Sequence, residues 1–95
     1  MQFAKPLRAG VAGGEISCSV RIWQQPRVRV GGRYRLGAGA IYVTSLREIA
    51  PTDITDALAK RSGFANVDAL LATARHGRGD RVFLVEFGYE EDEAS

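Results

Sequence analysis

Alternating polar and apolar residues in the first half of the chain predict β-strands. A strand turns successive side chains to opposite faces of its sheet. In residues 17–23 one face is apolar and holds Cys18, Val20 and Ile22. The opposite face holds Ser17, Ser19, Arg21 and Trp23. We therefore expect the first set to lie in a core and the second set to lie at the surface.

Residues 27–30 and 33–36 alternate in the same way, and Gly31–Gly32 lies between them. Two adjacent glycines are a strong turn signal, so the two segments are predicted to form a β-hairpin. After the break at residues 37–39, residues 40–44 are rich in β-branched and aromatic side chains. That composition favours a further strand.

Two short helices and a final strand are predicted in the second half of the chain. The first helix is expected to be capped by Asp53 and to end before Gly63. The second is expected to be capped by Asn66 and closed by Gly77. Residues 81–89 then alternate as a strand. This order predicts an α+β fold with a mainly antiparallel sheet. Closure of the short strands into a small β-barrel would remove the sheet edges.

The length of 95 residues favours a single domain, because a second core would have too few residues to bury. Charge divides the chain into two parts. Residues 1–89 carry 13 basic and 7 acidic residues, a net charge of +6. Residues 90–95 are acidic and are predicted to be a disordered tail. An alternative is that this tail folds back over the basic part as an intramolecular competitor.

Six arginines and no acidic residue lie between Glu15 and Glu48, namely Arg21, Arg27, Arg29, Arg33, Arg35 and Arg47. The planar guanidinium matches phosphate oxygens and stacks on bases, so a polyanion is the expected partner. The alternative is a solvated strand surface that happens to be rich in arginine.

Several other classes of function have no support in the sequence. No run approaches the roughly 18 apolar residues of a membrane span, and residues 1–8 lack the apolar run of a signal peptide. The single Cys18 cannot form an internal disulfide. One Cys, one His and scattered carboxylates give no metal-ligand spacing, and the glycines form no phosphate-loop motif. We expect a cytoplasmic protein without a metal, cofactor or membrane partner.

The order of these segments resembles an ASCH domain, a compact β-barrel relative of the PUA RNA-binding domains. The resemblance covers residues 3–87 and rests on residues 14–21, the hairpin region 30–36, the helix junction 62–64 and the last strand. The family phrase G-x-K-[TS]-x-[TS]-x-R is matched by Gly14, Ser17, Ser19 and Arg21. Two positions depart from the family: Ile16 replaces the Lys, and Arg33 stands where the family usually has Asp.

The resemblance implies a surface that binds nucleic acid, most often RNA. Some members hydrolyse the acetyl amide of N4-acetylcytidine with a Lys, a Thr and a Glu, and others are associated with RNA cleavage. The Thr corresponds to Ser19, which keeps a hydroxyl. The Lys corresponds to Ile16, and the Glu falls near Ser62 or Gly63, so neither group is retained.

Because the Lys and Glu of the family are not retained, the sequence supports binding better than catalysis. A serine nucleophile needs a neighbouring base. The sole histidine, His76, could be such a base. Alternatively, it is the last residue of a helix, where a cation suits the helix dipole. We expect a non-catalytic protein that binds single-stranded or structured RNA through Ser17, Ser19, Arg21, Trp23, Arg33 and Arg35. Alternatives are a hydrolase of RNA or a modified nucleoside that uses Ser19, and a module that binds an acidic protein. Trp23 could stack a base or pack at the rim of the barrel.

Overall fold

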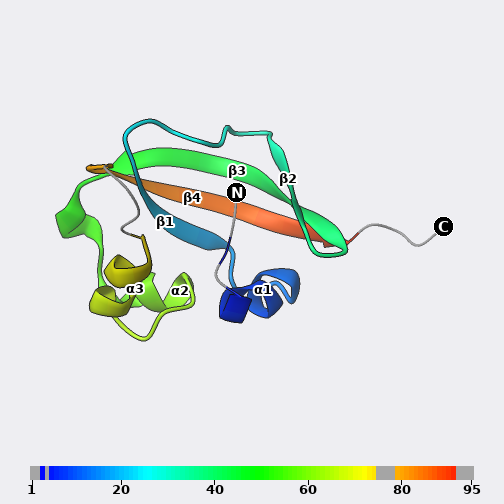
Figure 1. Cartoon of the computed structure of the whole chain (residues 1–95), viewed down its shortest axis with the longest axis horizontal. Helices are drawn as coiled ribbons and strands as arrows, with labels where there is room; N and C mark the ends of the chain where they lie inside the picture. Colours follow the sequence, from blue (N-terminus) through cyan, green and yellow to red (C-terminus); the bar gives the residue numbers. More distant parts are fainter. Residues whose placement is uncertain (1–2, 4, 75–78, 92–95) are drawn as a thin grey trace.

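Four strands and three short α-helices make up the fold (Figure 1). The computed structural model describes residues 3, 5–74 and 79–91. In chain order the elements are α1 (Lys5–Ala12), β1 (Cys18–Trp23), β2 (Arg33–Leu36), β3 (Gly39–Ile49), the 3-10 helix η1 (Pro51–Asp53), α2 (Asp56–Arg61), α3 (Val67–Ala74) and β4 (Arg81–Glu91). None of the helices in the described ranges has the length and apolar character that a bilayer span requires.

The strands form one antiparallel sheet in the order β1-β4-β3-β2, which curls into a half-barrel (Figure 1). The expected α+β class and antiparallel pairing are confirmed. Closure into a barrel is not observed, because β1 and β2 are the two edges of the sheet and do not pair with each other. Segment 24–32 runs from one edge to the other in place of that pairing (Figure 1).

The predicted hairpin is wrong in its register. Residues 27–30 are not a strand, and β2 pairs instead with β3 across a turn at Gly37–Ala38. Gly37 has φ 58°, which suits glycine in a tight turn. This register places Tyr34 opposite Ile41, so both side chains reach the same core. Core packing of the strand residues therefore favours the turn at Gly37–Ala38 over the predicted turn at Gly31–Gly32.

The sheet carries a core on each face. We call the inner face the one that bears Phe3, Val11, Val28, Ile41, Val43, Val85 and Phe87. The outer face bears the second core, made by Cys18, Val20, Ile54, Ala59, Leu70, Val82 and Leu84 under α2 and α3. Residues 82–85 of β4 are all buried, since both of their faces are covered.

A β-bulge at Thr44 separates two halves of β3. Val43 pairs with Phe87 and Ser45 pairs with Glu86, so Thr44 is the extra residue. Before the bulge, Val43 packs on the inner face, and after it Leu46 packs on that same face.

The two helices lie between the late strands, as predicted. Asn66 caps α3, because its Oδ1 accepts a hydrogen bond of 2.9 Å from the Ala69 N–H. The cap of α2 is Thr55, whose Oγ1 accepts from Leu58 N–H at 3.2 Å, and not Asp53 as predicted. Asp53 lies in η1, and its carboxylate accepts from Ala50 N–H at 2.9 Å. The roles expected for His76 and Gly77 concern positions outside the described residues.

Two features at the ends of the described chain differ from the sequence prediction. Helix α1 was not predicted, and it packs on the inner face through the fully buried Val11 and through Leu7. Strand β4 continues to Glu91, so Glu90 and Glu91 are sheet residues and not part of a disordered tail. Pairing with Ala40 and Gly39 of β3 extends the strand that far. The rest of the predicted tail, residues 92–95, lies outside the described ranges.

Candidate nucleic-acid interface

Three of the predicted site residues, Ser19, Arg21 and Trp23, lie on the inner face of β1. Ser19 pairs with Val85 of the first core and is only 9% exposed. Arg21 and Trp23 are half-buried. The alternation of β1 was predicted correctly, but the face expected at the surface points toward the inner core, where Phe3 lies against Arg21. These residues therefore form an interior and not an open binding surface.

The contacts of Arg21 are structural. Its Nε donates a hydrogen bond of 2.8 Å to Ser19 Oγ, and its guanidinium lies 4.9 Å from the centre of the Phe3 ring. Burial lowers the pKa of Arg21 below its ordinary value, although an arginine stays protonated at any physiological pH. Trp23 packs on Phe83, with the ring centres 5.8 Å apart. Ser17 is exposed, and its carbonyl accepts from Phe87 N–H at 2.9 Å.

Among the described residues, the polar side chain that contacts the Ser19 hydroxyl is Arg21. A guanidinium donates to its oxygen and cannot take its proton. Ser62, near the position of the family's Glu, is buried. Its hydroxyl donates to Leu58 O at 2.9 Å and lies 3.5 Å from Cys18 Sγ.

Arg33 and Arg35 lie on the outer side of the other sheet edge. Arg33 pairs with Tyr42 and Arg35 pairs with Ala40, whereas the neighbouring Tyr34 turns to the inner core. Both arginines are exposed. The structure therefore does not bring the six predicted residues together, because β1 and β2 are opposite edges and their polar side chains face opposite sides of the sheet.

A different set of arginines lies together in sequence and in space. Arg27 and Arg29 are exposed and flank the buried Val28 in segment 24–32, which leads into β2. We call the exposed arginines of this continuous stretch the arginine edge: Arg27, Arg29, Arg33 and Arg35. In Figure 1 the stretch follows the side of the sheet away from α2 and α3.

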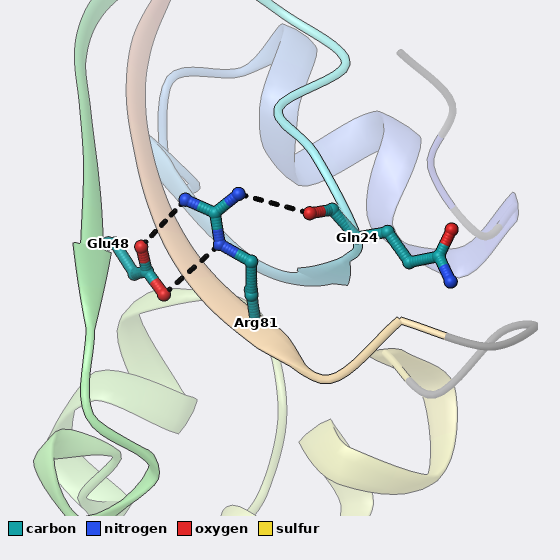
Figure 2. A network of polar contacts seen from close by, with 3 residues as sticks. All are labelled: Gln24, Glu48 and Arg81. Carbon is teal, nitrogen blue, oxygen red and sulfur yellow. Dashed lines mark hydrogen bonds and ion pairs between the residues drawn. The ribbon is translucent and has the colours of Figure 1, made fainter.

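A polar network fixes the start of this stretch (Figure 2). Arg81 Nη2 and Nε donate to the two carboxylate oxygens of Glu48 at 2.8 and 3.3 Å, and Nη1 donates to Gln24 O at 3.1 Å. The hydrogen bonds from Arg81 lower the pKa of Glu48, and the same bonds raise the pKa of Arg81. The guanidinium also lies 5.0 Å from the centre of the Phe83 ring. Strands β3 and β4 thus hold the end of β1 where segment 24–32 begins.

Backbone contacts fix the rest of the stretch. Gly31 N–H donates to Val43 O at 2.8 Å, and Val43 N–H donates to Gly32 O at 3.0 Å. The Tyr34 hydroxyl accepts from Arg29 N–H at 3.1 Å. With Val28 anchored in the core, the backbone of the arginine edge is held by the sheet. A backbone ordered before binding reduces the entropy that a ligand would have to overcome.

A groove of about 590 Å³ adjoins the arginine edge between α1 and the turn from β2 to β3. Its lining includes Arg8, Arg35, Leu36, Tyr89 and Glu91. Arg8 therefore continues the basic surface beyond Arg35. Among the described residues, Glu90 opposes that surface, since Arg33 Nη2 forms an ion pair of 3.0 Å with Glu90 Oε2.

Two contributors to this surface were not among the predicted site residues: the arginine pair Arg27 and Arg29, and Arg81. The charge count included Arg27 and Arg29 among the six arginines. That they lie on the same stretch of surface as Arg33 and Arg35 follows only from the pairing of β2 with β3. No pattern in the sequence identifies Arg81 as the anchor of Gln24. Across residues 3, 5–74 and 79–91, no cluster of three or more His, Cys, Asp or Glu side chains could hold a metal ion. Comparisons with protein-family models, curated proteins and solved structures found no match to this chain.

Proposed function

We propose that this chain is a non-catalytic RNA-binding domain that contacts phosphates along the arginine edge. The observation that carries the proposal is the placement of four exposed guanidiniums on one stretch whose backbone is held by the sheet. Each phosphate neutralised by a fixed cation releases counterions, which favours association. Arginine adds a planar fork that binds phosphate oxygens in pairs.

The order of sequence segments that resembles an ASCH domain supports the same ligand. We infer the PUA-like assignment from that order alone. The binding surface in this proposal differs from the one the family motif suggested, because Ser19 and Arg21 are occupied with each other and with Phe3. The interior position of Ser19 also favours binding over hydrolysis.

Salt dependence of RNA affinity tests the proposal. Four phosphate contacts to a single strand should give a log-log slope of about −3. The double variant Arg27→Gln/Arg29→Gln should reduce that slope to about −1.5, since two contacts are lost. Affinity that does not change with salt would overturn the proposal.

The matched control is the double variant Lys60→Gln/Arg61→Gln on α2. It removes the same charge from the opposite side of the molecule, where both residues are exposed (Figure 1). Its slope should equal that of the unmodified chain. An equal reduction of the salt slope in the two double variants would show that net charge alone drives binding and would contradict a defined surface.

A hydrolase is tested in parallel with labelled RNA and with N4-acetylcytidine. We expect no turnover of either substrate. Turnover that disappears in Ser19→Ala would replace the binding proposal with a catalytic one.

A further inference from the structure

One aromatic side chain on the outer face of the sheet is open to solvent. Tyr42 lies in β3, one residue from the fully buried Ile41, and is 37% exposed. Of the described side chains, large hydrophobic ones are exposed at only two positions, Tyr42 and Val30. Tyr42 adjoins the arginine edge, because it pairs directly with Arg33.

The ring of Tyr42 lies against the backbone of Gly88, its partner in β4. A Cβ added at Gly88 would be 2.3 Å from both Cζ and Oη of Tyr42 and 2.7 Å from Cε2. These separations are far below van der Waals contact, so only a glycine at position 88 lets the ring lie there. One side of the ring is supported by the sheet, and the other side faces outward.

The other two tyrosines have different surroundings. The hydroxyl of Tyr34 accepts from Arg29 N–H, and the hydroxyl of Tyr89 donates to Leu36 O at 3.1 Å. Both side chains are half-buried and pack on the inner core. Within the described ranges, no hydrogen bond holds the hydroxyl of Tyr42. Packing and hydrogen bonding thus involve both the ring and the hydroxyl of Tyr34 and Tyr89, whereas among the described residues the Tyr42 side chain has only the contact of its ring with Gly88.

Arg33 is the cross-strand neighbour of Tyr42. The side chain of Arg33 starts on β2 and reaches Glu90 on β4, so it crosses β3 next to Tyr42. Both members of this ion pair are well exposed. A flat aromatic ring beside a guanidinium is the combination that binds a base and the neighbouring phosphate of a single strand.

We propose that Tyr42 stacks one unpaired base while Arg33 binds the adjacent phosphate, so that the ligand of the arginine edge is single-stranded RNA. This proposal rests on the proposed function and adds the residue that selects unpaired over paired bases. In a duplex the bases are stacked on each other, and a rigid ring on a sheet cannot reach their faces.

The test compares Tyr42→Thr and Tyr42→Phe on a single-stranded RNA and on a duplex of the same sequence. Threonine suits an exposed strand position, so the fold should be retained. Stacking on an aromatic ring predicts that Tyr42→Thr weakens single-strand binding by about 5-fold to 150-fold. Tyr42→Phe should bind as the unmodified chain does. Duplex affinity and the salt slope should be the same in all three proteins.

Gly88→Ala provides a second variant, in which residue 42 is still a tyrosine. The added methyl group would displace the ring from the backbone, and single-strand affinity should fall in the same direction as in Tyr42→Thr. Thermal melting of each variant confirms that it is folded before binding is compared.

The outcomes separate this inference from the proposed function. If the unmodified chain binds RNA with a steep salt slope but Tyr42→Thr and Gly88→Ala bind as tightly, the stacking role is wrong and the arginine edge stands. If single-strand and duplex RNA lose affinity equally in Tyr42→Thr, selection of unpaired bases is also wrong. If no RNA binds with salt-dependent affinity, the proposed function itself is overturned.

Discussion

The inner face of β1 and the arginine edge share one sequence pattern and have opposite surroundings. Both segments alternate polar and apolar residues, and both include arginine. In β1 the guanidinium of Arg21 lies inside, bound to Ser19 and covered by Phe3. In the arginine edge, Val28 and Tyr34 turn inward and the arginines turn outward. Alternation therefore defines two faces of a segment, but the rest of the chain decides which face water reaches.

The difference comes from what lies over each segment. Phe3 covers β1 from the inner side and forms an edge-to-face contact with Phe87, with the ring centres 5.4 Å apart. On their outer side, β2 and the neighbouring part of β3 leave Arg33 and Tyr42 exposed.

The largest expected effect is on the cover of β1. Phe3→Ala removes a buried ring from the first core and from its contact with Arg21, and should lower the free energy of unfolding by about 3 kcal/mol. Denaturant unfolding measures this loss. A change below about 1 kcal/mol would mean that Phe3 does not close the inner face.

A pair of matched variants compares the two regions directly. Arg21→Met should lower the free energy of unfolding by about 1 to 2 kcal/mol, because a hydrogen bond and a cation–π contact are lost, and should leave RNA affinity unchanged. Arg33→Met should change stability by less than about 0.5 kcal/mol and reduce the salt slope by about 0.7. The reverse pattern would show that the interior of β1 is the RNA surface.

Glu90→Gln should strengthen RNA binding by about two- to fivefold at low salt, since it releases Arg33 from an exposed ion pair. Glu15→Gln is the control, because it removes the same charge from an exposed position before β1. Titrations of both variants at two salt concentrations give the comparison. An equal gain in Glu15→Gln would attribute the effect to net charge.

The smallest effect concerns pH and the anchor at Gln24. The pKa of Glu48 is lowered in the folded chain, so its contribution to stability is present above its unfolded pKa of about 4.3 and is lost as pH falls through the folded value. Glu48→Gln should therefore melt slightly below the unmodified chain at pH 7. The two melting temperatures should converge as pH falls through the folded pKa of Glu48. A constant difference across this range would contradict a role for the Glu48 charge.

Local signals predicted a large part of the fold. The alternation of β1, the cap at Asn66 and the break at Gly63 are short-range features, and the structure contains all three. Gly63 has φ 92° just after α2, as expected for a residue that ends a helix. Helix α1 escaped prediction because Gly10 lies in its interior and weakens the pattern. A Cβ there would be 2.7 Å from Ile16 Cδ1, so packing with Ile16 requires the glycine.

The site was harder to predict than the fold because it depends on pairings between distant segments. The choice between Gly31–Gly32 and Gly37–Ala38 as the turn decides the neighbours of Arg33. The correct choice brings Tyr42 beside it and Glu90 within reach. Neither contact has a signature within a short window of sequence.

The bulge at Thr44 has a consequence for how this chain can vary. Odd-numbered residues of β3 point inward before it, as Val43 does, whereas after it the even-numbered Leu46 points inward and Ile49 joins the opposite core. One surplus residue thus resets the phase of the strand. Deleting Thr44 should leave residues 45–49 on the faces they now occupy, because Val43 and Ser45 already pair with consecutive residues of β4, Phe87 and Glu86. Replacing the exposed Thr44 side chain should also cost little. At this position the strand should therefore tolerate the loss of one residue as well as a change of side chain.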